Sequence, residues 1–348
     1  MKYDYIIVGQ GIGGTLLSYF LIKNGQKVLV IDNGHLTSAS KVAAGIVNPI
    51  TGRRYVKSWM FEELLEFAKA TYGELDELLG ISCFEPRNII RVLFNNREVH
   101  DYYARSGELM YQKFMLDSSD VSEYSKTLKP FYDTGEVTYS GKVNLQILLK
   151  RYAEYLSETQ SLLIESFDFQ ALKIEPDKIR YKNIEAKNII FSEGIKATEN
   201  PYFGYLPFKG AKGEVLIIRI PNLKPVKIFK HRIFLVPLYE DVFWAGATND
   251  NQYADDLPSE RGRKELISKI NEIIHIPYEI LDHQAAIRPN AKDRRPFIGK
   301  HLKLDNVFVF NGLGTKGSSI APYFAHHFTN HLLNNEPLMK EVDVRRFE

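Results

Sequence analysis

Apolar and polar residues follow two periods along this chain, one typical of strands and one typical of helices. Near the start, residues 5–8 form an apolar run that predicts a buried parallel strand, and residues 15–24 have helical periodicity. A second apolar run follows at 27–31. Glycines separate the first run from the helix. This order predicts a strand, a glycine turn, a helix and a second strand, which together form a βαβ unit.

The rest of the chain contains amphipathic helical stretches and many short β-rich runs. Helical patterns predict helices over 59–79, 96–106, 143–157 and 260–273. Apolar or alternating runs predict strands over 88–94, 162–165, 171–174, 187–191, 213–219, 227–229, 233–237 and 242–245. The segment 286–319 is glycine-rich again. We therefore predict an α/β fold in which separated segments build a Rossmann-like domain, with β-rich insertions between them.

Composition excludes several kinds of site and partner. With 45 Lys and Arg against 43 Asp and Glu the net charge is +2, so bulk charge favours neither nucleic acid nor a membrane as a partner. The single cysteine, Cys83, excludes an internal disulfide and fits a reducing compartment. No metal-ligand spacing stands out, so we predict no metal site. Because the sequence shows neither a signal-peptide pattern nor an apolar run of about 20 residues, we expect a cytoplasmic protein without a membrane span.

The glycine turn after the first strand has the spacing of a dinucleotide-binding motif. Gly9, Gly11 and Gly14 give G-x-G-x-x-G directly between the predicted strand and helix. The first glycine permits the tight turn, the second lets the backbone approach a pyrophosphate, and the third allows close helix packing. Asp32 ends the second strand, where a carboxylate accepts a hydrogen bond from a ribose hydroxyl. The segment therefore predicts a nucleotide cofactor at the start of the helix.

A long loop of small residues follows the second predicted strand. Residues 35–54 are too many for an ordinary turn and contain several alanines, serines and glycines. Small side chains let the backbone lie close to a ligand, and long ordered loops often carry function. We interpret this segment as a binding loop.

Several motifs together resemble the D-amino-acid oxidase superfamily of FAD-dependent oxidoreductases, which includes glycine oxidase and sarcosine oxidase. They occur in family order as TSASKVAAG at 37–45, FKGAKGEVL at 208–216, AGAT at 245–248, AIRPNAKDRRPFIG at 286–299 and DNVFVFNGLGTKGSSIAPYFA at 305–325. The resemblance implies FAD rather than NAD. It also implies two parts: an FAD-binding domain over 1–80, 140–205 and 285–348, and an α+β substrate domain with an antiparallel sheet over 81–139 and 206–284.

The resemblance also implies which residues contact the cofactor. These are Gly9, Gly11, Gly13, Gly14, Asp32, Ser40, Ala43, Ala44, Gly45, Gly194, Gly312, Gly314, Thr315, Lys316, Gly317 and Ser318. Three mild departures from the family pattern are Ala286 in place of a glycine, Ser192-Glu193-Gly194 in place of an alanine-glycine turn, and Asp32 where many relatives have glutamate. The cysteine that holds the flavin covalently in sarcosine oxidase has no counterpart, because Cys83 lies in a different segment. We therefore expect non-covalent FAD.

Three basic residues stand at positions that resemble the substrate site of the family. Arg288 matches the residue that holds the substrate carboxylate, for which the paired geometry of a guanidinium is suited. Lys316 matches a carboxylate-binding lysine of sarcosine oxidase, and could equally lie at the pyrimidine end of the flavin, where its charge would stabilise the reduced anion. Arg54 matches an active-site arginine more loosely. We predict these three as catalytic residues.

The sequence leaves three functions open. The first is oxidation of the C–N bond of an amino acid or N-substituted glycine, a small amine that carries a carboxylate, by hydride transfer to the flavin. The second follows from a resemblance of 44–49 and 311–322 to the oxidoreductase half of the bifunctional enzyme of methylaminomethyl-thiouridine biosynthesis, which removes a carboxymethyl group from a wobble uridine of tRNA. The basic residues at 52–57 and 292–300 would then face RNA. The third is a non-catalytic flavin-binding sensor.

Overall fold

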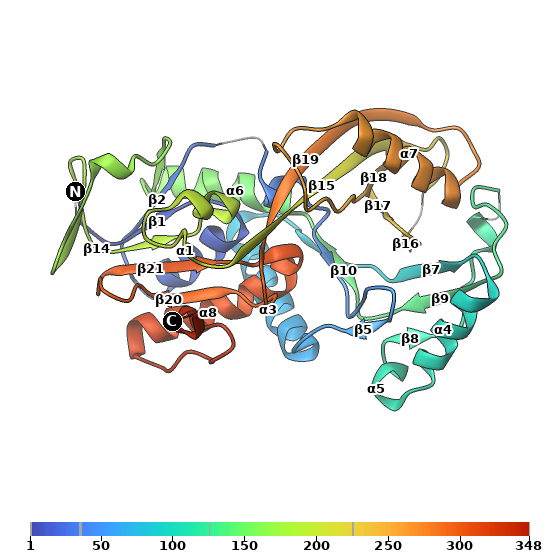
Figure 1. Cartoon of the computed structure of the whole chain (residues 1–348), viewed down its shortest axis with the longest axis horizontal. Helices are drawn as coiled ribbons and strands as arrows, with labels where there is room; N and C mark the ends of the chain where they lie inside the picture. The colour runs from blue at the N-terminus through green and yellow to red at the C-terminus, as the bar shows by residue number, and fades with distance from the viewer. Residues whose placement is uncertain (1, 35–36, 125, 225, 348) are drawn as a thin grey trace.

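Two large β-sheets form the frame of the molecule (Figure 1). The structure, a computed structural model, describes residues 2–34, 37–124, 126–224 and 226–347. Within this part of the chain each large sheet has eight strands, and two smaller sheets lie beside them. The first two residues of the predicted binding loop, 35 and 36, and the chain ends 1 and 348 lie outside the described residues.

The first large sheet is the Rossmann-like one that the sequence predicts. Its parallel part runs in the order β11 (Leu162–Ile164), β2 (Val28–Asp32), β1 (Lys2–Val8), β14 (Ile184–Phe191) and β21 (Val307–Asn311). Antiparallel strands extend it, namely β13 (Lys178–Tyr181), β12 (Leu172–Glu175) and β20 (Phe297–Lys300). Strands from three distant segments thus meet in one sheet, which confirms the predicted fold class.

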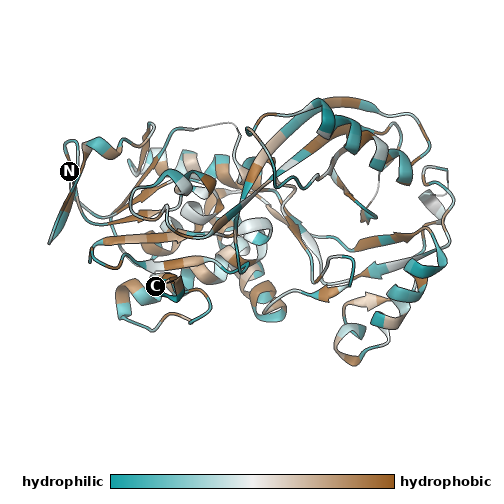
Figure 2. Cartoon of the chain, in the orientation of Figure 1, coloured by the Kyte–Doolittle hydropathy of each residue, from teal (hydrophilic) through white to brown (hydrophobic). Residues whose placement is uncertain are grey.

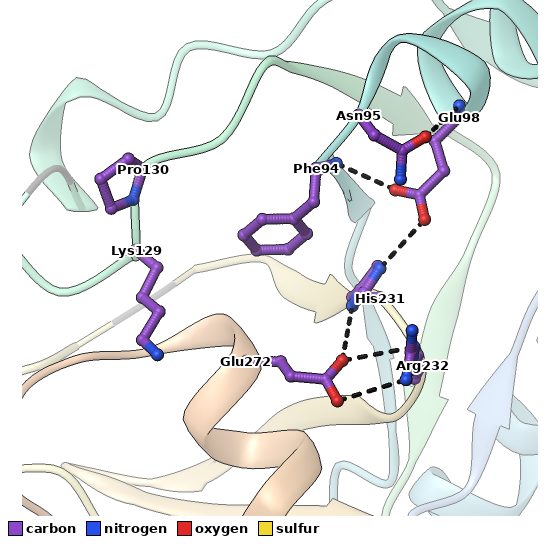
Figure 3. A pocket seen from close by; sticks show the side chains of 8 residues that line it. All are labelled: Phe94, Asn95, Glu98, Lys129, Pro130, His231, Arg232 and Glu272. Atoms are coloured by element: carbon purple, nitrogen blue, oxygen red, sulfur yellow. Dashed lines mark hydrogen bonds and ion pairs between the residues drawn. The ribbon is translucent and has the colours of Figure 1, made fainter.

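Four long helices pack on this half of the molecule. They are α1 (Ile12–Lys23), α3 (Phe61–Leu79), α6 (Leu145–Glu158) and α8 (Gly317–Asn334), and their apolar side chains join one large core with the strands. Figure 2 shows the hydrophobic residues concentrated in the strands and inner helices, while α4 (Asn96–Ser106) is largely hydrophilic. The hydrophobic pattern predicts a helix over 143–157, but residues 141–143 form strand β10 and α6 begins two residues later than predicted, at Leu145.

Helix α8 is not predicted by the sequence pattern, because it starts with glycine and serines and contains Pro322. A proline inside a helix removes one hydrogen bond to the carbonyl four residues earlier, here that of Ser318. The hydroxyl of Tyr72 from α3 donates to this carbonyl at 2.7 Å. The contact between α3 and α8 therefore satisfies the group that the proline leaves open.

The second large sheet is antiparallel except at one pair. Its order is β19 (Glu279–Ala291), β15 (Phe208–Arg219), β18 (Val242–Gly246), β17 (Phe234–Tyr239), β16 (Ile228–Lys230), β7 (Ile89–Leu93), β9 (Asp133–Val137) and β8 (Met115–Leu116). Among the described strands of this sheet, only β16 and β7 pair in parallel. Helix α7 (Glu260–Ile273) covers one face, as the upper right of Figure 1 shows. The other face joins the core of the first half.

Strand β19 crosses residue 285, where the sequence analysis places a domain boundary. The division into two domains itself stays a prediction. The smaller sheets combine β3 (Ile46–Val47), β10 (Gly141–Val143) and β6 (Phe84–Pro86), and β4 (Ile50–Thr51) with β5 (Val56–Lys57).

Short helical segments complete the described chain. They are α2 (Ala39–Val42), α5 (Leu109–Gln112), and the 3₁₀ turns η1 (Ser122–Tyr124), η2 (Phe169–Ala171), η3 (Gly194–Glu199), η4 (Gly314–Lys316) and η5 (Val344–Phe347). None of the helices that the structure describes has the length and apolar character needed to cross a bilayer.

Packing requires a glycine at position 135 in β9 of the second sheet, whereas Gly73 in α3 has open space around it. A Cβ on Gly135 would overlap the ring of Tyr102, whose hydroxyl donates to the carbonyls of Leu116 and Glu136 at 2.9 and 3.1 Å. We expect Gly135→Ala to lower the free energy of unfolding by about 1–3 kcal/mol or more, because the ring cannot move without losing these bonds.

The control is Gly73→Ala, at an exposed position of α3 where a Cβ meets nothing within 4 Å. It should raise the free energy of unfolding by roughly 0.5–1 kcal/mol, since alanine is the better helix former. Urea titration of both variants checks the pair. Equal effects of the two substitutions would contradict the packing argument.

Candidate cofactor and substrate site

The turn between β1 and α1 has space only for glycine at two of its motif positions. Gly9 has a φ of +104°, and a Cβ there would lie 2.5 Å from the carbonyl oxygen of Ser192 at the end of β14. A Cβ on Gly14 would overlap the carbonyl oxygen of Gly9. The turn therefore brings the start of α1 close to the carboxyl ends of β1 and β14, where ligands bind in sheets of this kind.

The start of α1 leaves backbone amides available to an anion. Its N-cap, Gly11, has no side chain to cap the helix, and its first turn contains no acidic residue. The amide of Ile12 donates to the hydroxyl oxygen of Ser40 at 3.1 Å, so the predicted loop residue Ser40 lies directly at the helix start. Helix N-termini of this type bind phosphates through their amides and dipole.

Asp32 connects the glycine turn to the loop after β2. One of its carboxylate oxygens accepts from the amide of Gln10 at 2.8 Å, and the other accepts from the amide of Gly34 at 2.7 Å. A cavity of about 890 Å³ opens beside it. Its walls include Gln10, Asp32, Lys41, Gln146, Leu149 and His283. This volume lies within the range of small-molecule pockets.

The loop of small residues joins the two halves of the molecule. Gly45 has a φ of +69°, and a Cβ there would overlap the carbonyl oxygen of Val143 in β10. Ala44 is buried and Ala43 is exposed. The indole nitrogen of Trp244 in β18 donates to the carbonyl of Val42 at 2.8 Å. The loop is thereby held between the glycine turn and the second large sheet.

A second glycine-rich helix start lies against the first. Gly312 and Gly314 adopt φ values of +73° and +58° in the turn before α8. A Cβ on Gly317 would lie 3.1 Å from Ile12 at the start of α1, and one on Gly13 would lie 3.2 Å from Leu313. Thr315 is exposed in this turn, and Ser318 is buried in α8. The two helix starts thus converge at one place.

Lys316 lies in this second turn, partly buried. Its amine donates to the hydroxyl oxygen of Ser58 at 3.1 Å. Burial lowers the pKa of Lys316, and the positive charges of Arg295 and Arg294 lower it further. Among the described residues no carboxylate lies within ion-pair distance of its amine. Its charge is therefore available to a ligand.

Arg288 projects from β19 across the neighbouring strand β15. One of its terminal nitrogens donates to the carbonyl of Thr248 at 3.1 Å, and a Cβ on Gly213 would overlap the guanidinium. Burial lowers the pKa of Arg288 from its usual high value. No ion pair to Arg288 is formed within the parts of the chain that the structure describes. The guanidinium is positioned by the backbone and keeps donors free for an anionic group.

Two of the predicted site residues, Arg54 and Gly194, show no contact with Arg288 or Lys316. Arg54 is exposed in the turn between β4 and β5 and shows no contact with Arg288 or Lys316. Gly194 starts η3 with a φ of +60°, and its carbonyl accepts from the side-chain amide of Asn311 at 2.9 Å. Their functional roles stay predictions.

Thr248 and Ser58 contact the site residues Arg288 and Lys316, although no spacing in the sequence singles them out. Trp59 contacts Arg295 nearby. Thr248 lies in the AGAT segment, which is the one signal that could have found it. Ser58 binds Lys316, and the ring of Trp59 lies 4.1 Å from the Arg295 guanidinium.

Comparison with known proteins decides the family. The family model described as DAO, FAD dependent oxidoreductase, matches residues 4–331. The chain belongs to the DAO family of FAD-dependent oxidoreductases. This confirms the predicted family and FAD dependence, and makes the protein an enzyme of the FAD-dependent amino-acid oxidase and dehydrogenase class.

Three relatives illustrate the match to the DAO family. Glycine oxidase of Bacillus licheniformis is 22% identical over 371 residues, which cover 100% of this chain and 97% of the relative. The structure of glycine oxidase from Bacillus cereus ATCC 14579 has a TM-score of 0.80 at 18% identity, with 96% of both chains covered. Iminodiacetate oxidase from Chelativorans sp. BNC1 has a TM-score of 0.81 at 16% identity, with 97% of this chain and 98% of that chain covered.

The residues present fit the FAD of a DAO-family enzyme. Two helix starts without acidic residues in their first turns converge at Ile12 and Gly317. The glycine turn leaves room for a pyrophosphate to approach the amides of α1, and Asp32 stands at the rim of a cavity of suitable size for the nucleoside end. Gly9, Gly11, Gly13, Gly14, Ser40 and the start of α8 would hold the cofactor.

Glu193 beside the glycine turn predicts a pH effect on stability. Burial raises the pKa of Glu193 to about 7, although the side-chain amide of Asn200 donates to its carboxylate at 2.6 Å. Since the folded pKa lies above the ordinary value of about 4.3, its contribution to stability is present below pH 4 and is lost as the pH rises through 7. Glu193→Gln should therefore flatten the fall in unfolding free energy between pH 5 and 8.

Urea unfolding of the FAD-loaded protein at four pH values across this range measures the effect. Glu77→Gln, at an exposed position of α3 and not among the groups that act on Glu193, is the control and should leave the profile unchanged. Identical profiles for wild type and Glu193→Gln would refute the assignment.

Proposed function

We propose that the protein oxidises the C–N bond of an amino acid or N-substituted glycine, using non-covalently bound FAD. The observation that carries this proposal is the Arg288 guanidinium, which is partly buried and has no acidic partner among the described residues. The guanidinium contacts the carbonyl of Thr248 and lies over Gly213. It therefore lies on the face of the second sheet that joins the core of the cofactor half. A substrate carboxylate would supply the missing partner. Glycine oxidase and iminodiacetate oxidase, to which the fold is similar, support this substrate class.

FAD, when bound, supplies the acceptor for a hydride from the carbon next to the amine. The chain's own residues bind and orient the substrate. Arg288 would hold the carboxylate through two parallel hydrogen bonds, which fixes the position of the adjacent carbon. Lys316 would add a positive charge near the second helix start, where negative charge in the cofactor or substrate is stabilised.

The environment of Cys83 supports non-covalent binding. The thiol is fully buried, and burial and the nearby Asp76 carboxylate raise its pKa well above the usual range. The thiolate is the reactive form of cysteine, and these surroundings disfavour it.

A second candidate is the removal of a carboxymethyl group from a modified wobble uridine of tRNA. It is favoured by the convergence of two basic segments at Lys316. The charges of Arg294 and Arg295 act on Lys316, and Ser58 and Trp59, which follow the basic segment 52–57, contact Lys316 and Arg295. Arg53, Arg54, Lys292 and Arg294 are exposed there, whereas Lys300 is paired with Asp305 at 2.6 Å. RNA phosphates would bind such a surface.

The third reading, a non-catalytic flavin sensor, is disfavoured by Arg288. A guanidinium without a carboxylate partner is costly to bury, and a protein that does not bind an anion there would gain nothing from it.

Two steps test these alternatives. The visible spectrum before and after denaturation, with identification of the released chromophore, establishes whether FAD is bound and whether it is non-covalent. Anaerobic mixing with a panel of amines then measures bleaching of the flavin. Bleaching by glycine or an N-alkyl glycine supports the first function. Bleaching only by carboxymethylaminomethyl-modified tRNA selects the second, and no bleaching by any member supports the sensor.

The carboxylate anchor yields a specific prediction. Arg288→Met should weaken transition-state binding of a carboxylate-bearing amine by about 2–5 kcal/mol, because a buried charge pair loses one partner. Anaerobic flavin reduction measured against substrate concentration checks it. The control is Arg97→Met in α4, an exposed residue that should leave the kinetics unchanged. Unchanged reduction by the Arg288→Met variant would rule out the anchor.

A further inference from the structure

A second pair of cations lies on the same sheet face as Arg288. Lys230 in β16 and Arg91 in β7 are direct register partners across a parallel pair. The row continues through Phe234 and Gly246 to Val215 in β15. Partners in such a row share one face of the sheet, and residues two apart on a strand do as well. Lys230 and Arg91 are therefore on the face of Gly213, which the Arg288 guanidinium covers.

Neither cation has an acidic partner in the part of the chain that the structure describes. The amine of Lys230 donates to the carbonyl of Arg232 at 2.9 Å and lies 4.3 Å from the ring centre of Phe234. The guanidinium of Arg91 lies 5.0 Å from the ring centre of Tyr55. Over the described residues no Asp or Glu oxygen is within ion-pair distance of either. By contrast, Lys269, the other cation near Lys230, is paired with Glu265.

This arrangement is electrostatically unfavourable in the absence of a ligand. Burial lowers the pKa of Lys230 to about 7, and the charges of Arg91 and Lys269 contribute. Like charges directly opposite on neighbouring strands destabilise a sheet. Both residues are only partly buried, so part of each remains exposed to solvent. An anion between them would remove the repulsion.

We propose that Lys230 and Arg91 form a second oxyanion-binding site, distinct from Arg288, which takes a phosphate or a carboxylate group. The guanidinium offers paired donors and the ammonium a point charge, a combination suited to oxyanions. The ring of Tyr55 contacts the Arg91 guanidinium, and the ring of Phe234 contacts the Lys230 amine.

The oxyanion could be free phosphate or part of the substrate. Lys230 lies three strand steps from Gly213, which is about 15 Å across the sheet at about 4.8 Å per step. A substrate that reached both sites would be longer than a free amino acid. In that case the site would select amines with a distant second anionic group. This part of the inference rests on the proposed function.

The binding test uses the FAD-loaded protein and inorganic phosphate, so that the cofactor already fills its own phosphate site. Calorimetric titration at pH 7 should show one phosphate site whose Kd rises at least tenfold in both Lys230→Met and Arg91→Met. Lys173→Met, at an exposed position of the other large sheet, and Arg288→Met should retain it. Phosphate should also raise the thermal midpoint of the wild type but not that of Lys230→Met.

Two results would overturn the site: no phosphate binding by the wild type, or binding that both variants retain. Because this readout needs no amine oxidation, its outcome is independent of the proposed function. A kinetic arm distinguishes the sources. A rise in KM of Lys230→Met for an N-carboxymethyl amine carrying a distant phosphate, with the KM for glycine unchanged, supports an oxyanion borne by the substrate. Unchanged KM for both, with phosphate binding lost, supports free phosphate.

Discussion

Close packing at the glycine turn between β1 and α1 is the constraint on which the rest of the structure depends. A side chain on Gly14 would overlap the carbonyl of Gly9, and one on Gly9 would approach the carbonyl of Ser192, the residue that follows β14. The absence of these side chains sets α1 directly above the sheet. Helix α8 can then start beside it, so that two helix N-termini face one place. The positive ends of both helices would bind the phosphates of the FAD on which the DAO family depends.

Two buried hydrogen bonds connect the second sheet to the cofactor half. The Trp244 indole donates to the carbonyl of Val42, and the Lys142 amine, with only 2% of its side chain exposed, donates to the carbonyl of Pro237 at 3.0 Å. Burial lowers the pKa of Lys142, and Glu85 at 3.6 Å opposes this effect. Because each donor is removed from water, breaking either contact would leave a buried polar group unsatisfied. These contacts hold the face with Arg288 toward the cofactor half.

Cations that have no acidic partner among the described residues lie on this face and in the adjoining turn. Burial lowers the pKa values of Arg288, Lys316 and Lys230, and carboxylates elsewhere in the described chain pair with other cations. The net charge of +2 conceals this distribution, since a near balance of charges says nothing about where they lie. The local excess of positive charge favours anionic ligands. Amines with carboxylates and larger polyanions both meet that condition.

The sequence by itself determined the βαβ unit, because glycine spacing and strand periodicity are local and follow from backbone sterics. Its motifs also indicated the FAD-dependent family to which the chain belongs. It did not predict α8, in which the hydroxyl of Tyr72 from α3 donates to the Ser318 carbonyl that Pro322 leaves without its helical donor. Nor could it show that Thr248 orients Arg288, that Arg54 lies exposed, or that Lys230 pairs with Arg91. Those facts depend on which distant strands become neighbours. Only the tertiary structure decided them, because strand order and register are set by packing of the whole core rather than by any local pattern.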